Sequence, residues 1–250
     1  MERFRTYIEG VDCSGKTTIG KAVAQKAGVD NVGELFMRKD NPWNAESTGE
    51  VPTNHPLFIA FLYKAAIWDI LHHDSTKPLM QISFVAYRST AYQTALKIKD
   101  APLFENLLEY IPKFGTTVIL DASIEARQER LKQRSMEQGV REVSKNDALI
   151  FKKPELVMEM ADIIKDRACR YLDAIVVDTT GNTVEESILQ VYELSTKNGV
   201  VCAENKNGCA RIKADLPKFE KEILAYVKQL DKQHGFSDQM LTRILEPLSI

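Results

Sequence analysis

The chain has 250 residues, of which 44% are hydrophobic, and this size allows one main domain with a real core and a small appendage. The 33 Lys and Arg residues nearly balance the 35 Asp and Glu residues, so the whole molecule has no general attraction to nucleic acid or acidic membranes, although a local basic patch stays open. The four cysteines and four histidines show no zinc-ligand spacing, and we find neither a signal peptide nor an apolar run of membrane-spanning length. We expect a soluble cytoplasmic protein with reduced thiols and no membrane partner.

Short apolar or β-branched runs alternate along the chain with longer segments whose apolar residues follow helical spacing. The short runs predict strands at residues 4–8, 32–37, 79–85, 116–120 and 174–177. The longer segments predict helices at residues 16–27, 56–72, 89–99, 123–133, 155–172 and 184–195. Because parallel strands need long crossover connections, this alternation favours an α/β fold built on a parallel sheet.

Two polar segments interrupt the alternation. Residues 40–56 hold three prolines and predict a loop over one end of the sheet, and about residues 134–147 predict a mobile lid between two helices. After residue 196 the composition becomes that of a linker, with room for a short hairpin. An amphipathic helix at 216–230 and a short helix from Asp238 follow.

We therefore divide the chain into a main domain, residues 1–196, and a C-terminal helical extension, residues 197–250. For the extension we favour docking on the core. A contact between copies, as in a homodimer, and a role in holding a large substrate are the alternatives.

The segment between the first predicted strand and the first predicted helix reads GVDCSGKT and fits the pattern G-x-x-x-x-G-K-[ST]. In this pattern the glycines let backbone amides approach phosphate oxygens, the lysine reaches the β- and γ-phosphates, and the last hydroxyl binds Mg²⁺. We therefore expect a bound nucleoside triphosphate, taken as ATP, together with Mg²⁺. The predicted contacts are Gly10, Val11, Asp12, Cys13, Ser14, Gly15, Lys16, Thr17 and Thr18.

The fate of the γ-phosphate depends on residues outside this loop. A regulatory GTPase needs N-K-x-D, and the nearest match, residues 144–147, has the wrong order. Asp121, which follows a predicted strand, is a candidate to bind the metal and equally a candidate to cap the next helix. Arginines in and before the lid suit a kinase, because phosphoryl transfer is catalysed by positioning and by neutralising charge. They are Arg127, Arg130, Arg134 and Arg141, the last three being our catalytic candidates with Lys16.

Across about residues 3–196 the chain resembles the thymidylate kinases and their relatives. The resemblance implies a three-layer P-loop fold with a parallel five-stranded sheet. It also implies that Asp12 lies near the acceptor sugar, that Phe58 stacks on the acceptor base, that Tyr92 and Gln93 face that base, and that residues 179–182 neighbour adenine. The resemblance is carried by YIEGVDCSGKTT, HPLFIA, STAYQ, ILDASIEARQERLKQR and YLDAIVVDTTGNTVEESI, in the family's order.

Three positions depart from the family pattern. Ser83-Phe84 stands where the family has Asp-Arg, whose arginine grips the acceptor's phosphate. Leu62 and Cys13 likewise stand where the family has arginines. A charge-assisted bond contributes about 1.5 to 3 kcal/mol, so these losses weaken the case for a free monophosphate acceptor. Arg88 and Arg38 are the candidates to supply the charge instead.

Four functions stay open at this point. We narrowly favour an ATP-dependent kinase of the hydroxymethyl group of 5-hydroxymethyluracil in DNA, because the base-stacking residues are present and the phosphate clamp is absent. Such an enzyme needs platforms for an unstacked base, for which Phe58, Trp43 and Tyr92 are candidates. In any such kinase, Asp12 or Asp121 would orient the acceptor hydroxyl.

The main alternative is a nucleoside monophosphate kinase that converts dTMP to dTDP, which the acidic pI favours. A deoxynucleoside kinase is a lesser alternative, because Glu34 comes too early to end the second strand as its glutamate would. A non-catalytic binding module switched by nucleotide is the remaining one.

Overall fold

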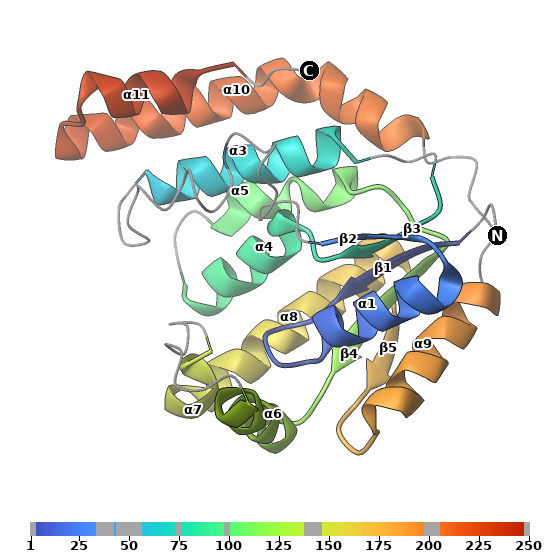
Figure 1. The fold of residues 1–250 in the computed structure, drawn as a ribbon. Helices are drawn as coiled ribbons and strands as arrows, with labels where there is room; N and C mark the ends of the chain where they lie inside the picture. Colours follow the sequence, from blue (N-terminus) through green and yellow to red (C-terminus); the bar gives the residue numbers. More distant parts are fainter. Residues whose placement is uncertain are drawn as a thin grey trace.

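The computed structural model describes residues 4–33, 43, 57–73, 77–97, 101–137, 147–197 and 206–247. Its centre is a parallel five-stranded sheet in the order β2-β3-β1-β4-β5, which confirms the predicted α/β fold (Figure 1). Because the chain crosses from one side of β1 to the other after β3, the carboxyl end of β1 is the switch point at which such sheets bind ligands. The strands are β1 (Arg5–Glu9), β2 (Asp30–Val32), β3 (Leu79–Ile82), β4 (Thr116–Asp121) and β5 (Ile175–Asp178).

Helices cover both faces of this sheet (Figure 1). The two helices α1 (Lys16–Ala27) and α9 (Val184–Lys197) pack together on one face. The other face carries a larger core, which the remaining helices build in two layers. They are α3 (Phe58–Leu71), α4 (Val85–Ala95), α5 (Ala101–Glu105), the 3₁₀ turn η2 (Leu108–Tyr110), α6 (Ile124–Glu137), α7 (Leu149–Lys152), α8 (Pro154–Leu172), α10 (Lys206–His234) and α11 (Asp238–Leu245).

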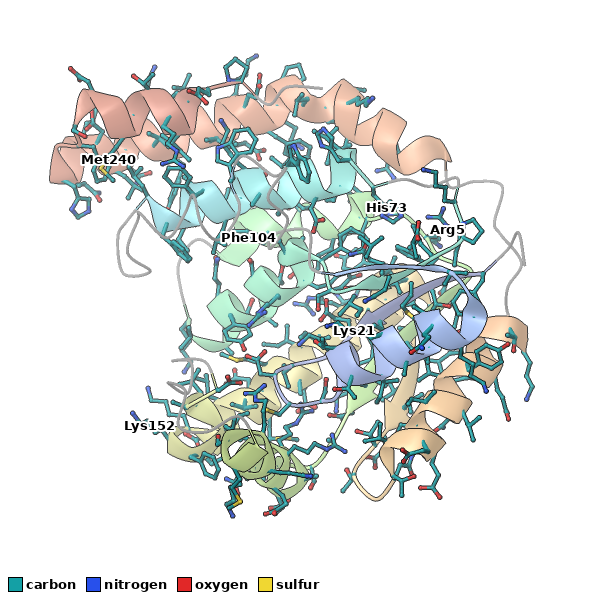
Figure 2. All side chains as sticks on the ribbon, in the orientation of Figure 1. Arg5, Lys21, His73, Phe104, Lys152 and Met240 are labelled. Carbon is teal, nitrogen blue, oxygen red and sulfur yellow. The ribbon has the colours of Figure 1, made fainter. Side chains whose placement is uncertain are left out.

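Successive side chains of strand β1 point alternately into the two cores on opposite faces of the sheet. Ile8 points to the face of α1 and α9, whereas Tyr7 points to the larger core on the opposite face. Phe104, labelled beneath α3 in Figure 2, belongs to this larger core and meets the Tyr63 ring edge-on with a centroid distance of 5.6 Å. Both cores therefore pack against side chains near the carboxyl end of β1.

Helix α4 begins at Val85, inside the segment 79–85 that we expected to be a strand, so that expectation is corrected. The backbone of Ser83 has a positive φ of 59° and turns the chain out of the sheet. The amide of Phe84 then donates to Glu9 Oε2 at 3.2 Å and the amide of Val85 to Asp69 Oδ2 at 3.2 Å. Two buried carboxylates thus satisfy the first amides of α4, which a reading of local spacing does not reveal.

The helical extension docks on the core, as favoured from the sequence. Its long helix α10 lies across α3 and runs in the opposite direction (Figure 1), with Leu216, Phe219 and Ile223 buried in the larger core. Helix α10 begins at Lys206, so the last residues of the predicted linker are helical, while residues 198–205, including the suggested hairpin, lie outside the described part. The short α5, η2 and α7 were not expected either.

Helix α3 is apolar on nearly every side, and the reason is that it lies between α4 and α10. Its one buried cation, Lys64, donates to the carbonyl of Glu246 after α11 and lies 4.7 Å from the centroid of the Trp43 ring. Burial lowers the pKa of Lys64 to about 8, against the opposing effect of Glu220 and Glu246. Within the described residues, no helix has both the length and the apolar character needed to cross a bilayer.

We expect Phe219→Ala to lower the free energy of unfolding by about 3 to 5 kcal/mol, because the ring is fully buried where α10 meets Tyr63 and Tyr110. Denaturant unfolding followed by circular dichroism measures the change. Gln229→Ala, at an exposed position of the same helix, is the matched control and should stay within about 0.5 kcal/mol of the parent. Equal effects of the two substitutions would contradict the docking of α10.

Candidate active site

The loop between β1 and α1 presents backbone amides to one end of the sheet. Helix α1 begins at Lys16 with no side chain capping its first turn, and the residue before it, Gly15, has a left-handed φ of 98°. A Cβ on Gly10 would lie 2.5 Å from the Leu120 carbonyl oxygen and 2.6 Å from Ser14 Oγ, so the loop requires glycine there. The uncapped amides and the positive end of the helix dipole together form a site for an anion.

A cleft of about 590 Å³ opens over this loop, within the size range of small-molecule sites. It extends from the loop to the turn that precedes α9, between α1 and the side of α6. The cleft therefore extends from the anion site to Asn182, in the turn that the family resemblance places beside adenine. The lining residues are Asp12, Cys13, Ser14, Gly15, Lys16, Thr17, Thr18, Ile19, Arg130, Gln133, Arg134, Asn182, Thr183, Val184 and Ser187.

Asp12 connects the loop between β1 and α1, which we call the phosphate loop, to helix α4. Its Oδ1 lies 3.3 Å from Arg88 Nη2 and 3.8 Å from Lys16 Nζ, and its Oδ2 accepts a hydrogen bond from the Tyr92 hydroxyl. Burial raises the pKa of Asp12, but the charges of Arg88 and Lys16 and the Tyr92 hydrogen bond outweigh burial and lower the pKa below its usual value. An ionised carboxylate therefore lies between the loop and α4.

Glu9, at the end of β1, also connects the phosphate loop with helix α4. Its buried carboxylate accepts hydrogen bonds from the Tyr7 hydroxyl at 2.5 Å, the Gly10 amide at 2.9 Å, the Ser83 hydroxyl at 2.7 Å and the Phe84 amide at 3.2 Å. Burial raises the pKa of Glu9, while the charge of Lys16 and the hydrogen bonds from Tyr7, Gly10 and Ser83 oppose that rise. Sequence analysis missed Glu9. The available signal was a carboxylate that directly follows the segment TYI of a buried strand, because a charged group there needs several hydrogen-bond partners.

Asp121 does not face the cleft as a metal ligand would. Its Oδ1 lies 2.8 Å from Arg127 Nη2 and accepts from the Ala122 amide, and its Oδ2 lies 2.8 Å from Lys165 Nζ. Both oxygens are thus bound by groups of this chain, and we do not carry the metal assignment forward. The alternative as a helix cap is wrong, because Ser123 Oγ accepts from the Ala126 amide and caps α6.

The arginines of α6 take three different positions. Arg127 is fully buried and donates to the carbonyl of Asp12, so it supports the loop from behind. Arg130 donates to the carbonyls of Cys13 and Ser14 at 3.3 Å and of Thr179 at 2.6 Å, so it joins the loop to the turn after β5. Both arginines therefore hold in place the segments that surround the cleft.

Arg134 lies at the mouth of the cleft. Its side chain is 44% exposed, and its Nη2 is 2.8 Å from Asp147 Oδ2, at the far base of the predicted lid. The hydrogen bond to Asp147 and the nearby charges of Asp147 and Asp12 outweigh burial and raise the pKa of Arg134. Within the described residues, Arg134 is the arginine of the predicted lid that lines the cleft. Arg141 lies outside the described residues.

The acceptor-side residues lie mainly on α4. Arg88 and Tyr92 meet at Asp12, and Gln93 is buried with a carbonyl oxygen that has no partner among the described residues. Phe58 begins α3 and is half-buried against the larger core, and Arg38 lies outside the described residues. Trp43 is only 3% exposed, so its suggested role as a platform is corrected to that of a core anchor.

The residues present fit a magnesium ion. Thr17, at the start of α1, is exposed and lines the cleft beside Lys16. Mg²⁺ binds through one or two protein oxygens, substrate phosphates and water, rather than through a dedicated protein cage. A single hydroxyl next to a phosphate site is the donor set that this mode requires.

No protein-family model matches the chain, and no curated protein matches it either. Similar solved structures include deoxyadenosine kinase from M. mycoides, 14% identical with a TM-score of 0.50, covering 77% of this chain and 98% of that one. Shikimate kinase from Acinetobacter baumannii is 16% identical with a TM-score of 0.47, covering 80% and 97%. Thymidylate kinase from Ehrlichia chaffeensis is 16% identical with a TM-score of 0.44, covering 75% and 96%. The likeness to the deoxyadenosine kinase shows a shared fold and carries no statement about substrate.

We expect Glu9→Gln to change how stability depends on pH. Because the pKa of Glu9 is higher in the folded protein than in the unfolded chain, the folded state binds more protons, and stability falls as pH rises from the ordinary carboxyl value to the folded value. The glutamine variant lacks this slope. Urea unfolding of both proteins across acidic pH measures it, and a difference between them that does not vary with pH would contradict the assignment.

Proposed function

We propose that the protein is an ATP-dependent phosphotransferase that carries the γ-phosphoryl group of ATP to a hydroxyl of a thymine-like deoxypyrimidine. The observation that carries the proposal is the position of Asp12. This carboxylate belongs to the phosphate loop and is bound by Arg88 and Tyr92 of α4, so the triphosphate side and the acceptor side of the cleft meet at one group. A binding module without catalysis has no need of such a group.

The triphosphate side neutralises and orients the donor. The first amides of α1 and the buried Lys16 would bind the β- and γ-phosphate oxygens, and the nucleoside would extend towards the turn that begins with Asn182. Thr17 would hold Mg²⁺, which when bound would neutralise charge on the phosphates. Arg134 would exchange its ion pair with Asp147 for the transferring group.

The reaction is an in-line displacement. The acceptor oxygen forms a bond to the γ-phosphorus while the bond from that phosphorus to the bridging oxygen of ADP breaks, and the hydroxyl proton passes to the carboxylate of Asp12. The lowered pKa of Asp12 keeps it ionised and ready to accept this proton, although it makes a weak base. A weak base is sufficient, because the transition state of phosphoryl transfer is loose and is stabilised mainly by positioning and charge.

For the acceptor we favour the hydroxymethyl group of 5-hydroxymethyluracil in DNA. Phe84 is fully buried, and its ring packs edge-on against Tyr7 at 5.1 Å and near Phe114 at 6.1 Å. The side chain at position 84 therefore points into the core. An arginine at this position would point the same way and could not bind the phosphate of an acceptor. A base hydroxyl within DNA brings no terminal phosphate to be clamped.

One observation favours the second candidate, conversion of dTMP to dTDP. The guanidinium of Arg88 lies one turn of α4 beyond Phe84, its side chain is 32% exposed, and it is already next to Asp12. Arg88 could therefore supply the charge that Phe84 lacks. An acceptor assay is needed to choose between the two candidates.

We expect γ-labelled ATP and Mg²⁺ to transfer label to duplex DNA that contains 5-hydroxymethyluracil. The measurement compares this DNA with unmodified DNA of the same sequence, dTMP and thymidine. Label on dTMP alone would establish the second candidate, and label on none of the acceptors, with the protein folded and ATP bound, would overturn the proposed function.

The same assay tests Asp12. We expect Asp12→Asn to lower kcat about 100- to 10,000-fold, because the amide cannot take the hydroxyl proton, while the affinity for ATP changes little. Glu129→Gln is the matched control, since it removes the charge of an exposed carboxylate on α6 that pairs with Lys132 and has no part in the proposed transfer. An Asp12→Asn enzyme with the kcat of the parent would show that Asp12 only positions α4.

A further inference from the structure

The outer face of α10 carries charge of one sign. Along the side chains described for this helix, 211–234, every exposed charged residue is basic and the other exposed residues are neutral. The four acidic residues of the same segment are all half-buried. The exposed basic residues are Arg211, Lys213, Lys218, Lys221, Lys228 and Lys232.

The acidic residues of α10 serve the docking of the helix. Asp215 accepts a hydrogen bond from the Tyr110 hydroxyl at 2.7 Å, Glu222 from the Tyr63 hydroxyl at 3.1 Å, and Asp231 from the Phe236 amide at 2.9 Å. They therefore point towards the core or the turn to α11 and leave the outer face to the lysines. The charges of α10 are thus separated between its two sides.

A solvated helix face usually mixes the two signs, and other helices of this chain do so. On α8, Arg170 pairs with Asp166 at 3.1 Å, and on α9, Lys197 pairs with Glu193 at 3.5 Å. Such pairs four residues apart contribute only a few tenths of a kcal/mol, but they cancel the field of the surface. On the outer face of α10, Arg211 pairs with Glu109 of η2 at 3.5 Å, and the exposed lysines described for this helix lack such partners.

Four of these residues form a line, which we call the basic stripe: Lys218, Lys221, Lys228 and Lys232. Their spacings of three, seven and four residues place them on one face of the helix, over about 21 Å at 1.5 Å per residue. Within the described part of the chain, none of the four has a carboxylate partner. A line of unneutralised ammonium groups of this length matches a regularly charged polyanion.

We propose that the basic stripe binds the phosphate backbone of DNA and so holds a DNA substrate against the enzyme. As a statement about the substrate, the inference rests on the proposed function. In Figure 1 the C-terminal end of α10 lies towards the same side of the molecule as the start of α3 and the loop before α1. DNA along the stripe would therefore run towards the side on which the acceptor enters.

The chemistry of the surrounding surface favours duplex DNA over a membrane. A helix that binds a bilayer inserts its apolar face, but the apolar face of α10, including Phe219 and Val227, is buried in the core. The exposed neighbours of the stripe, such as Ala225 and Gln229, offer neither a lipid anchor nor an aromatic platform for single-stranded bases. Phosphate contacts alone bind DNA without reading its sequence, which suits an enzyme that must find a modified base anywhere.

The test measures binding of the full chain to a fluorescently labelled duplex by anisotropy over a range of salt. If the stripe contacts four phosphates, its contribution to the slope of log K against log salt is about −3.6, or on the order of 100-fold in affinity between about 50 and 200 mM salt. Replacing Lys218, Lys221, Lys228 and Lys232 together by Gln should remove most of that slope and weaken binding at least about tenfold at low salt. All four side chains are exposed, so the variant should fold, which thermal unfolding checks.

The matched control replaces four exposed lysines on other helices and loops, Lys21, Lys97, Lys152 and Lys197, by Gln, with the same change in net charge. Lys21 is labelled on α1 in Figure 2, and α1 packs on the face of the sheet opposite to the core that α10 completes. Equal loss of binding in the control, or no DNA binding by the parent, would overturn the inference. So would stripe-dependent binding to vesicles of phosphatidylserine and phosphatidylcholine without binding to DNA.

Phosphoryl transfer separates this inference from the proposed function. If both hold, the stripe variant loses transfer to modified DNA through a higher KM, with kcat nearly unchanged, while its affinity for ATP equals that of the parent. If the parent binds DNA through the stripe but transfers no label to any acceptor, the surface stands and the proposed kinase fails. If transfer to modified DNA is the same in variant and parent, the surface fails and the kinase stands.

Discussion

A single buried carboxylate, that of Glu9, joins three parts of the fold that would otherwise be independent: the end of β1, the phosphate loop and the start of α4. Because the Gly10 and Phe84 amides share it, the loop that would bind the triphosphate cannot shift without shifting the helix that carries Arg88 and Tyr92. Two non-glycine residues with positive φ, Cys13 and Ser83, lie beside this junction. Backbone strain of this kind persists where the surrounding contacts fix the geometry, and here they fix the position of the loop relative to α4.

The C-terminal extension has two sides with different roles. Its apolar residues and its carboxylates complete the large core over α3, and the Lys64 ammonium binds the carbonyl that follows α11. Its lysines face outward, so the same helix that covers α3 gives an acidic protein, with a formal net charge of −2, one basic surface. A composition that excludes general attraction to nucleic acid is therefore compatible with a local site for it.

Local sequence was enough to predict the parallel sheet, helix α1 to its last residue and the phosphate loop, because a strand, a glycine-rich turn and a helix leave their signals within a few residues. It failed where distant groups decide the structure. The start of α4 depends on carboxylates at Glu9 and Asp69, and the engagement of Asp121 depends on Lys165, 44 residues away. Helix α10 began earlier than expected, since KNG reads locally as a turn and only docking on α3 makes the helix favourable.

The central claim is that the cleft at Lys16 binds a nucleoside triphosphate with Mg²⁺. The proposed transfer to an acceptor, and the use of the basic stripe to hold a DNA substrate, both depend on this binding. Calorimetric titration of the full chain with Mg²⁺ and ATP measures this directly. The account predicts one site per chain and an affinity about 10- to 100-fold weaker in Lys16→Ala, because the charge-assisted bond to the phosphates is lost. No heat of binding from the folded parent, or equal binding by Lys16→Ala, would contradict it.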